Sequence, residues 1–363
     1  MKKIKVGILF GGKSAEHEVS LQSAKNVFEA IDKDKYDVTL IGIDKVGKWF
    51  LLNPAKFLHN ENNPKLIALD IEGADAVALV PSSGGLLTNL TEGHSTQVSI
   101  DVVFPILHGP FGEDGTLQGL LKLAGVPFVG SSVLGSAVGM DKDVMKRLLR
   151  DAGLPIGKFL AFKEEDEIDF AGISAQLGLP LFVKPANLGS SVGISKVNNQ
   201  IEFEKAVALA FSFDNKIIIE EFIAGRELEC SVLGNQFPLA SGVGEIIPTH
   251  EFYSYDAKYI DDKGAIVEIP AKVSEEIKSQ VQTLALKTFK TLSCEGLGRI
   301  DFFLKSDGSL LINEINTIPG FTKISMYPQL WHEAGVSYPD LIDRLLELAL
   351  ERFAREKKLE SDF

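Results

Sequence analysis

The stretch Leu297–Phe321, LGRIDFFLKSDGSLLINEINTIPGF, decides how the rest of the sequence is interpreted. Two β-rich runs flank Ser-Asp-Gly, a pattern that predicts a β-hairpin. If the Asp-Gly pair forms a two-residue turn, Asp301 faces Glu314. In the same register, Arg299 faces Asn316. Because side chains alternate between the two faces of a strand, all four lie on one side of the hairpin.

Two directly opposed acids destabilise a hairpin unless positive charge lies between them. The oxygen atoms of Asp301, Glu314 and Asn316 suit a hard cation such as Mg²⁺, which keeps waters and substrate phosphates as further ligands. We therefore predict a metal site on this face, with Phe303 and Ile312 continuing it as an apolar wall. The alternative is a solvated edge on which the neighbouring arginine neutralises one acid.

Length, charge and cysteine spacing limit the class of protein. A chain of 363 residues can form two or three domains with ample cores. Its net charge of −13 argues against a nucleic-acid surface. Cys230 and Cys294 have no metal-like spacing, which favours a reducing cytoplasm. No apolar run is long enough for a signal-peptide core or a membrane span, so we expect no membrane partner.

Residues 1–130 predict an α/β domain. A buried strand, Ile4–Phe10, runs into two glycines, a helix and a second strand, Asp37–Ile43, which is the order found in an open parallel, Rossmann-like sheet. Residues 45–100 read as a polar, glycine-rich excursion before the next strand, Val102–Leu107.

The sequence of residues 131–215 predicts a small α+β unit. The sequence of residues 216–363 predicts a unit built on a mainly antiparallel sheet. Ile217–Glu221 is expected to cross into that last sheet, which the amphipathic helices Ser274–Thr291 and Tyr338–Arg355 would cover. The tyrosine-rich loop 242–262 has the length of a lid.

Several loops carry residues suited to ligand binding. Gly7–Ser14 matches the P-loop sequence pattern. However, its middle residues are the end of a buried strand, where a P-loop needs a flexible bend, and the two glutamates that follow would place negative charge near the phosphates. We favour Glu16 as the useful group, at the strand end where open α/β sheets bind ligands. His108–Gly119 is a second glycine-rich loop at this edge, although a single histidine in a loop is usually structural.

Phosphate and nucleotide contacts are expected further along the chain. Lys184 precedes a Gly/Ser-rich turn whose backbone N–H groups could surround phosphate oxygens, although a flexible solvent loop would look similar. Lys142, ahead of a helix, is a second candidate. Glu220–Ile223 ends a strand, where its backbone could form hydrogen bonds with the edge of an adenine while Glu227 binds the ribose. The alternative is that these adjacent acids are simply exposed to solvent.

Taken together, these motifs resemble the ATP-grasp superfamily and, within it, the D-alanine–D-alanine ligases. Six motifs stand in the family's order from Val6 to about Leu350: FGGKSAEHEVSLQSA, HGPFGEDGTLQG, VKPANLGSSVGISKV, YDAKYI, GRIDFF and NEINTIPGFT. The resemblance implies an open-sheet N-terminal domain followed by a two-part α+β ATP-grasp fold. It also implies ATP-dependent joining of two D-alanine molecules through an acylphosphate, for peptidoglycan synthesis.

The resemblance further implies a role for each matched residue. Two Mg²⁺ ions, with Mn²⁺ as a substitute, would bridge ATP and bind Asp301, Glu314 and Asn316. ATP would contact Lys142, Lys184, Glu220, Glu221, Ile223, Glu227 and Phe303. A hydrogen-bonded set that closes the lid would comprise Glu16, Ser190 and Tyr259. The oxyanion would be stabilised by Arg299 and the Gly320 N–H. The substrates' carboxylates would lie near His108, Ser325 and Met326.

Within this family, relatives that make a D-alanyl-D-lactate ester carry Phe in place of Tyr259. A homodimer, a cytoplasmic location and no nucleic-acid partner complete the expectations. Three rivals stay open from the sequence: a P-loop NTPase, an ATP-grasp ligase for other substrates, and a non-catalytic ATP-binding regulatory protein.

Overall fold

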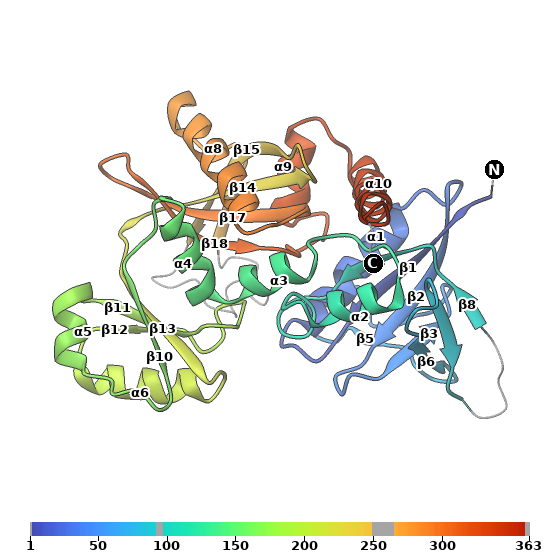
Figure 1. Ribbon diagram of the computed structural model, residues 1–363, viewed down its shortest axis with the longest axis horizontal. Helices are drawn as coiled ribbons and strands as arrows, with labels where there is room; N and C mark the ends of the chain where they lie inside the picture. The colour runs from blue at the N-terminus through green and yellow to red at the C-terminus, as the bar shows by residue number, and fades with distance from the viewer. Residues whose placement is uncertain (1, 92–96, 249–264, 360–363) are drawn as a thin grey trace.

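A computed structural model describes residues 2–91, 97–248 and 265–359. Its three main sheets form three units (Figure 1): an N-terminal unit, a central unit at the lower left and a C-terminal unit above. The predicted α/β class is confirmed. The exact boundaries at residues 130 and 215 stay predictions.

The N-terminal unit is a seven-stranded sheet in the order β8-β7-β6-β3-β2-β1-β9. Its elements are β1 (Ile4–Gly11), α1 (His17–Ala30), β2 (Tyr36–Ile43), β3 (Trp49–Leu52), β6 (Asp75–Leu79), β7 (Leu86–Asn89), β8 (Gln97–Ser99), β9 (Val102–Ile106) and α2 (Thr116–Ala124). Only β2, β1 and β9 run parallel to each other. Helix α1 packs on them because Leu21, Ala24 and Val27 recur at helical spacing and are fully buried.

The expectation of a parallel sheet with a polar excursion at 45–100 was therefore incomplete. That segment forms the antiparallel strands β3, β6, β7 and β8, and the small ribbon β4 (Leu58–His59) and β5 (Ala68–Leu69). These strands are two to five residues long, so turn residues outnumber the apolar positions that would have revealed them.

The central unit is an antiparallel sheet in the order β10-β13-β11-β12. Its elements are β10 (Phe159–Lys163), α5 (Phe170–Leu177), β11 (Leu181–Pro185), β12 (Ser195–Val197), α6 (Gln200–Phe211) and β13 (Lys216–Glu221). Strand β13 pairs with β10 and β11, so the prediction that Ile217–Glu221 crosses into the last sheet was wrong.

The C-terminal unit is the antiparallel sheet β16-β15-β14-β17-β18. Its elements are β14 (Gly225–Gly234), β15 (Leu239–Pro248), β16 (Ala265–Glu268), α8 (Glu275–Thr291), β17 (Gly296–Lys305), β18 (Leu310–Asn316), α9 (Met326–Glu333) and α10 (Tyr338–Glu356). Helices α3 (Val133–Met140) and α4 (Lys142–Asp151) connect the units. Met145 and Leu149 of α4 are buried in the core of this sheet, so the helix belongs to it by packing.

Helix α10 packs on β14 and β17 of the C-terminal sheet, as expected, and it also packs on β9 and α1 of the N-terminal unit (Figure 1). Amphipathic spacing predicts that a helix has a buried face but not which sheet covers it.

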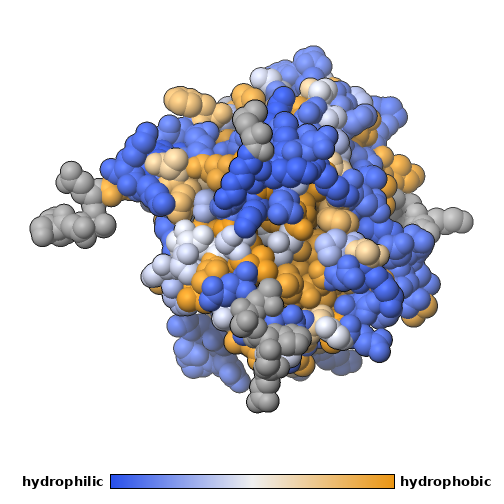
Figure 2. All heavy atoms as spheres, turned by 90° about the vertical axis from the view of Figure 1, so that its right-hand side faces the viewer, coloured by the Kyte–Doolittle hydropathy of each residue, from blue (hydrophilic) through white to orange (hydrophobic). Residues whose placement is uncertain are grey.

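Figure 2 shows the surface on the side of the N-terminal unit as mostly hydrophilic, with hydrophobic residues near the middle of this face. No helix in the described part of the chain combines the length and apolar character needed to cross a bilayer.

The β17–β18 hairpin confirms the predicted pairs Asp301–Glu314 and Arg299–Asn316. Its turn is not the predicted two-residue one: Lys305 pairs with Ser309 around a three-residue loop in which Gly308 has a φ of +83°. A bulge then shifts the register back by one residue between Asp301 and Phe302.

This bulge changes the predicted apolar wall. Ile312 pairs with Phe302 rather than Phe303, and both Ile312 and Phe302 are buried in the core. Only Phe303 stays on the half-buried face with Asp301. The prediction that Ile312 shares this face was therefore wrong.

Candidate active site

Three loops from two units meet around the carboxylate of Glu16. This side chain follows β1, immediately before α1, and is 8% exposed. A methyl group added to Gly109 would lie 3.3 Å from Glu16 Oε2, and one added to Gly189 would lie 3.5 Å from the same atom. The loop after β9 and the Gly/Ser-rich loop after β11 therefore both approach Glu16. Strand β1 continues through Gly11, which leaves no room for the flexible bend of a P-loop.

His108 follows β9 and is buried in this convergence. Its Nδ1 lies 3.0 Å from the carbonyl oxygen of Ile318, so Nδ1 carries the proton and donates it. Nε2 is then a lone-pair acceptor, and it has no hydrogen-bond partner among the described residues. Burial lowers the pKa of His108, although the Glu16 carboxylate opposes this change. The neutral ring thus keeps a buried acceptor at Nε2, close enough to Glu16 for the two groups to interact electrostatically.

The predicted metal face is occupied by opposite charges in this structure. Arg299 donates from Nε and Nη2 to the two oxygens of Asp301, at 2.7 and 2.8 Å. Arg299 Nε also lies 2.8 Å from Glu229 Oε2, and Asn316 donates to Asp301 Oδ2 at 3.0 Å. Lys142 Nζ lies 3.2 Å from Glu314 Oε2. The two acids are therefore neutralised separately, as their proximity requires.

The side chains of Asp301, Glu314 and Asn316 fit a divalent cation that shares its coordination with phosphates and water. All three carry oxygen atoms and lie on one half-buried face, and oxygen ligands are those that Mg²⁺ prefers. Across residues 2–91, 97–248 and 265–359 there is no cluster of three or more His, Cys, Asp or Glu side chains arranged as a metal cage. The protein would thus supply only part of the ligand shell.

Lysines from two units converge on Glu220. Lys184, at the end of β11, and Lys146, on α4, both pair with its carboxylate, the latter at 2.8 Å. Burial opposes ionisation of Glu220, but the two ammonium groups outweigh it and lower the pKa to about 2. Lys142 donates to the carbonyl oxygen of Leu188 at 2.7 Å. Positive charge therefore lines the contact between α4 and the central sheet.

The Glu220 cluster gives a prediction about acid stability. Because the folded pKa lies below the usual 4.5, Glu220 contributes stability above that pH, and this contribution is lost as the pH falls toward about 2. Glu220→Gln leaves two buried lysines without their carboxylate and should cost roughly 3–5 kcal/mol at neutral pH. Urea unfolding of both proteins should show the difference shrinking between pH 4.5 and 2.5.

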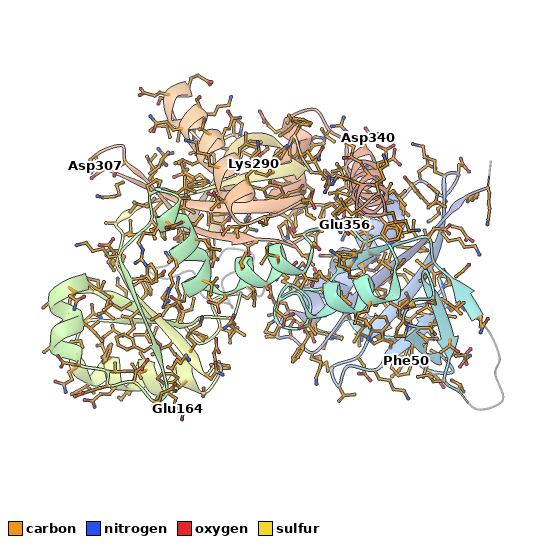
Figure 3. All side chains as sticks on the ribbon, in the orientation of Figure 1. Phe50, Glu164, Lys290, Asp307, Asp340 and Glu356 are labelled. Atoms are coloured by element: carbon orange, nitrogen blue, oxygen red, sulfur yellow. The ribbon has the colours of Figure 1, made fainter. Side chains whose placement is uncertain are left out.

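Glu164→Gln is the control, because this acid lies at the outer edge of the central unit (Figure 3). It should change neither the unfolding free energy at neutral pH nor its dependence on pH. A Glu220→Gln penalty that stays constant across the acid range would show that the carboxylate is not held ionised by the lysines.

A pocket of the C-terminal sheet joins the predicted metal and nucleotide residues. Its lining includes Glu227, Phe303, Arg299, Asp301 and Glu314. Strand pairing explains this, because Glu227 faces Phe303 across β14 and β17. Asp307, at the tip of the hairpin, lies well away at the outer end of the unit (Figure 3).

The predicted adenine-binding stretch has a partly structural use. Glu221 accepts from the Lys158 N–H through its side chain at 2.8 Å, and its own N–H donates to the Lys158 carbonyl oxygen. Ile223 packs against Gly157, where an added methyl group would lie 2.8 Å from its Cδ1. These contacts fix the chain between β13 and β14.

The segment after β18 brings Gly320 beside Ser325. Ser325 Oγ lies 3.2 Å from the position of an added methyl group on Gly320 and accepts from the Thr322 N–H at 3.0 Å. Ser325 and Met326 begin α9, whose N-terminus favours a negative group. The Met326 side chain is buried in an apolar cluster, so only its backbone can serve a carboxylate.

Ser190 and its neighbour Ser191 have φ values of 52° and 59°, in the left-handed region that non-glycine residues rarely adopt. Such strain is concentrated at ligand-binding loops. Tyr259 and most of the predicted lid 242–262 lie outside the described residues.

Sequence reasoning missed three further candidates. Lys146 is four residues after Lys142, on the same side of α4, which is the signal that could have identified it. Glu229 is two residues after Glu227 on β14 and so shares its face. Glu113 stood within a quoted motif without being singled out.

Comparison with known proteins gives matches over nearly the whole chain. Family models described as the D-ala D-ala ligase N-terminus and C-terminus match residues 5–131 and 148–347. A D-alanine–D-alanine ligase of Oceanobacillus iheyensis is 56% identical over 99% of both chains. The structure of the D-alanine-D-alanine ligase from Coxiella burnetii matches with a TM-score of 0.87 and 38% identity, covering 99% of this chain and 97% of that one.

A second solved structure, the VanG D-Ala:D-Ser ligase of Enterococcus faecalis, matches with a TM-score of 0.85 and 38% identity over 96% of this chain and all of the other. The fold and site together define an ATP-dependent ligase of the ATP-grasp class. More narrowly, the chain belongs to the D-alanine–D-alanine ligase family, whose members join two D-alanine molecules for cell-wall synthesis. This excludes the P-loop NTPase, and the relatives named here are ligases rather than regulatory proteins. An ATP-grasp ligase with a different second substrate is represented among them by the D-Ala:D-Ser ligase.

Proposed function

We propose that the chain forms D-alanyl-D-alanine through an acylphosphate, with the residues of the candidate active site in defined roles. The observation that carries this proposal is the convergence of Glu16, the Gly189 loop and the Gly109 loop at one point. The carboxylate of Glu16 can bind the ammonium group of the first D-alanine. His108, whose ring bonds to Ile318 two residues before Gly320, is the proposed contact to the carboxylate of the same substrate.

In the first step, a carboxylate oxygen of D-alanine attacks the γ-phosphorus of ATP, and the bond to the β–γ bridging oxygen breaks to release ADP. Lys142 and Lys184, already close to acids in this structure, are the cations that hold the phosphates. Glu227 and Phe303 line the nucleotide side of the pocket. The backbone of Glu220–Ile223 is the proposed adenine contact.

Asp301, Glu314 and Asn316 would hold the divalent cations; we propose two Mg²⁺ ions, with Mn²⁺ as a substitute. When bound, the cations offset the charge that develops on the transferred phosphoryl group.

In the second step, the amine of the second D-alanine attacks the acyl carbon, and phosphate leaves. Arg299 and the Gly320 N–H are the proposed donors to the oxyanion of the tetrahedral intermediate. The N-terminus of α9, with Ser325 and Met326, would orient the carboxylate of the second D-alanine.

One assay tests the proposed function: phosphate release from ATP with D-alanine, L-alanine, D-serine, D-lactate or nothing added. D-alanine should give phosphate and dipeptide in equal amounts, and L-alanine should give neither. The D-Ala:D-Ser relative makes D-serine the informative second acceptor. Phosphate release that does not depend on any amino acid would contradict the ligase.

We also predict that Tyr259 and Ser190 form one hydrogen-bonded latch with Glu16. A single hydrogen bond contributes about 0.5–1.5 kcal/mol, so Tyr259→Phe should slow dipeptide formation without unfolding the protein and should admit D-lactate more readily. Ser190→Ala should resemble it. Because both changes break one network, the double mutant should cost less than the sum of the two. Strict additivity in peptide and ester yields, with unchanged acceptor preference, would exclude the latch.

We further propose a cytoplasmic location and a homodimer. Both cysteines are free and buried, which supports a reducing compartment. Sedimentation velocity of the purified protein tests the oligomeric state.

A further inference from the structure

The peptide groups on both sides of Ile318 are held by the loop after β9. Glu113 Oε1 accepts from the Ile318 N–H at 3.0 Å, and His108 Nδ1 donates to the Ile318 carbonyl oxygen at 3.0 Å. Ile318 belongs to the segment after β18, more than 200 residues away in the sequence. Two side chains of the N-terminal unit thus fix both main-chain polar groups of one residue in the C-terminal unit.

Glu113 is itself held in place from the other side. Its second oxygen, Oε2, accepts from the Gly109 N–H at 2.7 Å, within the loop that also carries His108. Burial and the nearby Glu16 charge raise the pKa of Glu113 to about 8, while the two N–H groups favour the ionised carboxylate. A carboxyl group in such surroundings needs these two donors, because an unpaired acceptor there would be costly.

The segment held in this way carries Gly320, two residues beyond Ile318. Further contacts tie the following residue, Phe321, to its surroundings: its N–H lies 3.4 Å from Ser23 Oγ on α1, and its ring packs edge-on against Phe104 of β9 at 5.7 Å between centroids. Arg299, the other proposed oxyanion donor, stands on β17 instead. The two donors are therefore set by different parts of the fold.

We propose that Glu113 is a positioning residue that, together with His108, sets the Gly320 N–H for the second chemical step. This inference rests on the proposed function, since it assigns Gly320 to the oxyanion. A donor displaced by a fraction of an ångström loses most of its effect on a developing charge. Both Glu113 oxygens accept main-chain N–H groups, from Gly109 and Ile318, so Glu113 acts on the reaction through the position of these main-chain segments.

The test measures phosphate released per dipeptide formed. In Glu113→Gln, the amide nitrogen cannot accept, so one of the two N–H bonds is lost. The amine step should slow about ten- to a hundredfold, while the affinity for ATP changes little. The acylphosphate then persists and reacts with water, giving back D-alanine and phosphate. The ratio of phosphate to dipeptide should rise above one, and Glu113→Ala, which removes both acceptors, should raise it further.

Asp114→Asn is the matched control. Asp114 also accepts two main-chain N–H groups in this loop, from Phe111 at 2.8 Å and Thr116 at 2.9 Å, but it does not contact the Ile318 segment. The Asp114→Asn enzyme should release one phosphate per dipeptide formed. Variants of Glu113 that lose turnover with a ratio still at one, or that behave like Asp114→Asn, would overturn the proposal. A wild-type enzyme that makes no dipeptide would refute the proposed function instead.

Discussion

Glu314→Gln should abolish nearly all ligation and leave the fold intact. The carboxylate faces Asp301 across the hairpin and lies 3.2 Å from Lys142 Nζ, and its side chain is 25% exposed. Strand pairing does not depend on it, and the repulsion between the two acids falls. Losing a metal ligand should remove roughly 4 kcal/mol of transition-state stabilisation, or about a thousandfold in turnover.

Turnover, the thermal midpoint and Mn²⁺ binding in the presence of ADP, followed by electron paramagnetic resonance, together check this expectation. Asp307→Asn is the control, since it makes the same change of charge in the same hairpin at a 62% exposed side chain of the turn. It should leave turnover and Mn²⁺ binding unchanged. Near-normal activity of Glu314→Gln at ordinary Mg²⁺ would place the metal elsewhere.

The β17–β18 hairpin shows how much of the site could be predicted from the sequence. Its key pairs were predicted correctly although the turn and the register were each misjudged by one residue, and the two errors cancelled. A signal of the bulge was present: Leu310, Ile312 and Ile315 break the spacing of two that a regular strand requires. The burial of Ile312 followed from that break.

Long-range placement could not be predicted in the same way. Periodicity identified Tyr338–Arg355 as an amphipathic helix but could not show that it packs on the N-terminal unit as well as on the C-terminal sheet. The contact between Glu113 and Ile318 depends on two loops brought together by the whole fold, so no local pattern could reveal it. Motif order placed Glu16 and the Gly189 loop at one site only because the resemblance linked them.

Arg299→Lys should reduce turnover by about 10²–10³, or roughly 3–4 kcal/mol of barrier, with a smaller loss of ATP affinity. The guanidinium bridges Asp301 through two parallel hydrogen bonds and also reaches Glu229. A lysine ammonium carries the same charge but lacks the planar fork, so it cannot keep Asp301 in place and aim a donor at the oxyanion together. Single-turnover kinetics and calorimetric titration with a non-hydrolysable ATP analogue separate the two quantities.

Arg226→Lys is the matched control on the same sheet. Arg226 forms an equivalent two-point pair with Glu245, at 2.7 and 2.6 Å, but it is assigned no part in binding or catalysis. Its replacement should affect turnover by less than about threefold, because a partly exposed ion pair contributes little. If Arg299→Lys weakens ATP binding as much as it slows turnover, the guanidinium acts mainly on the bound nucleotide, since an oxyanion donor would change the barrier and leave the ground state alone.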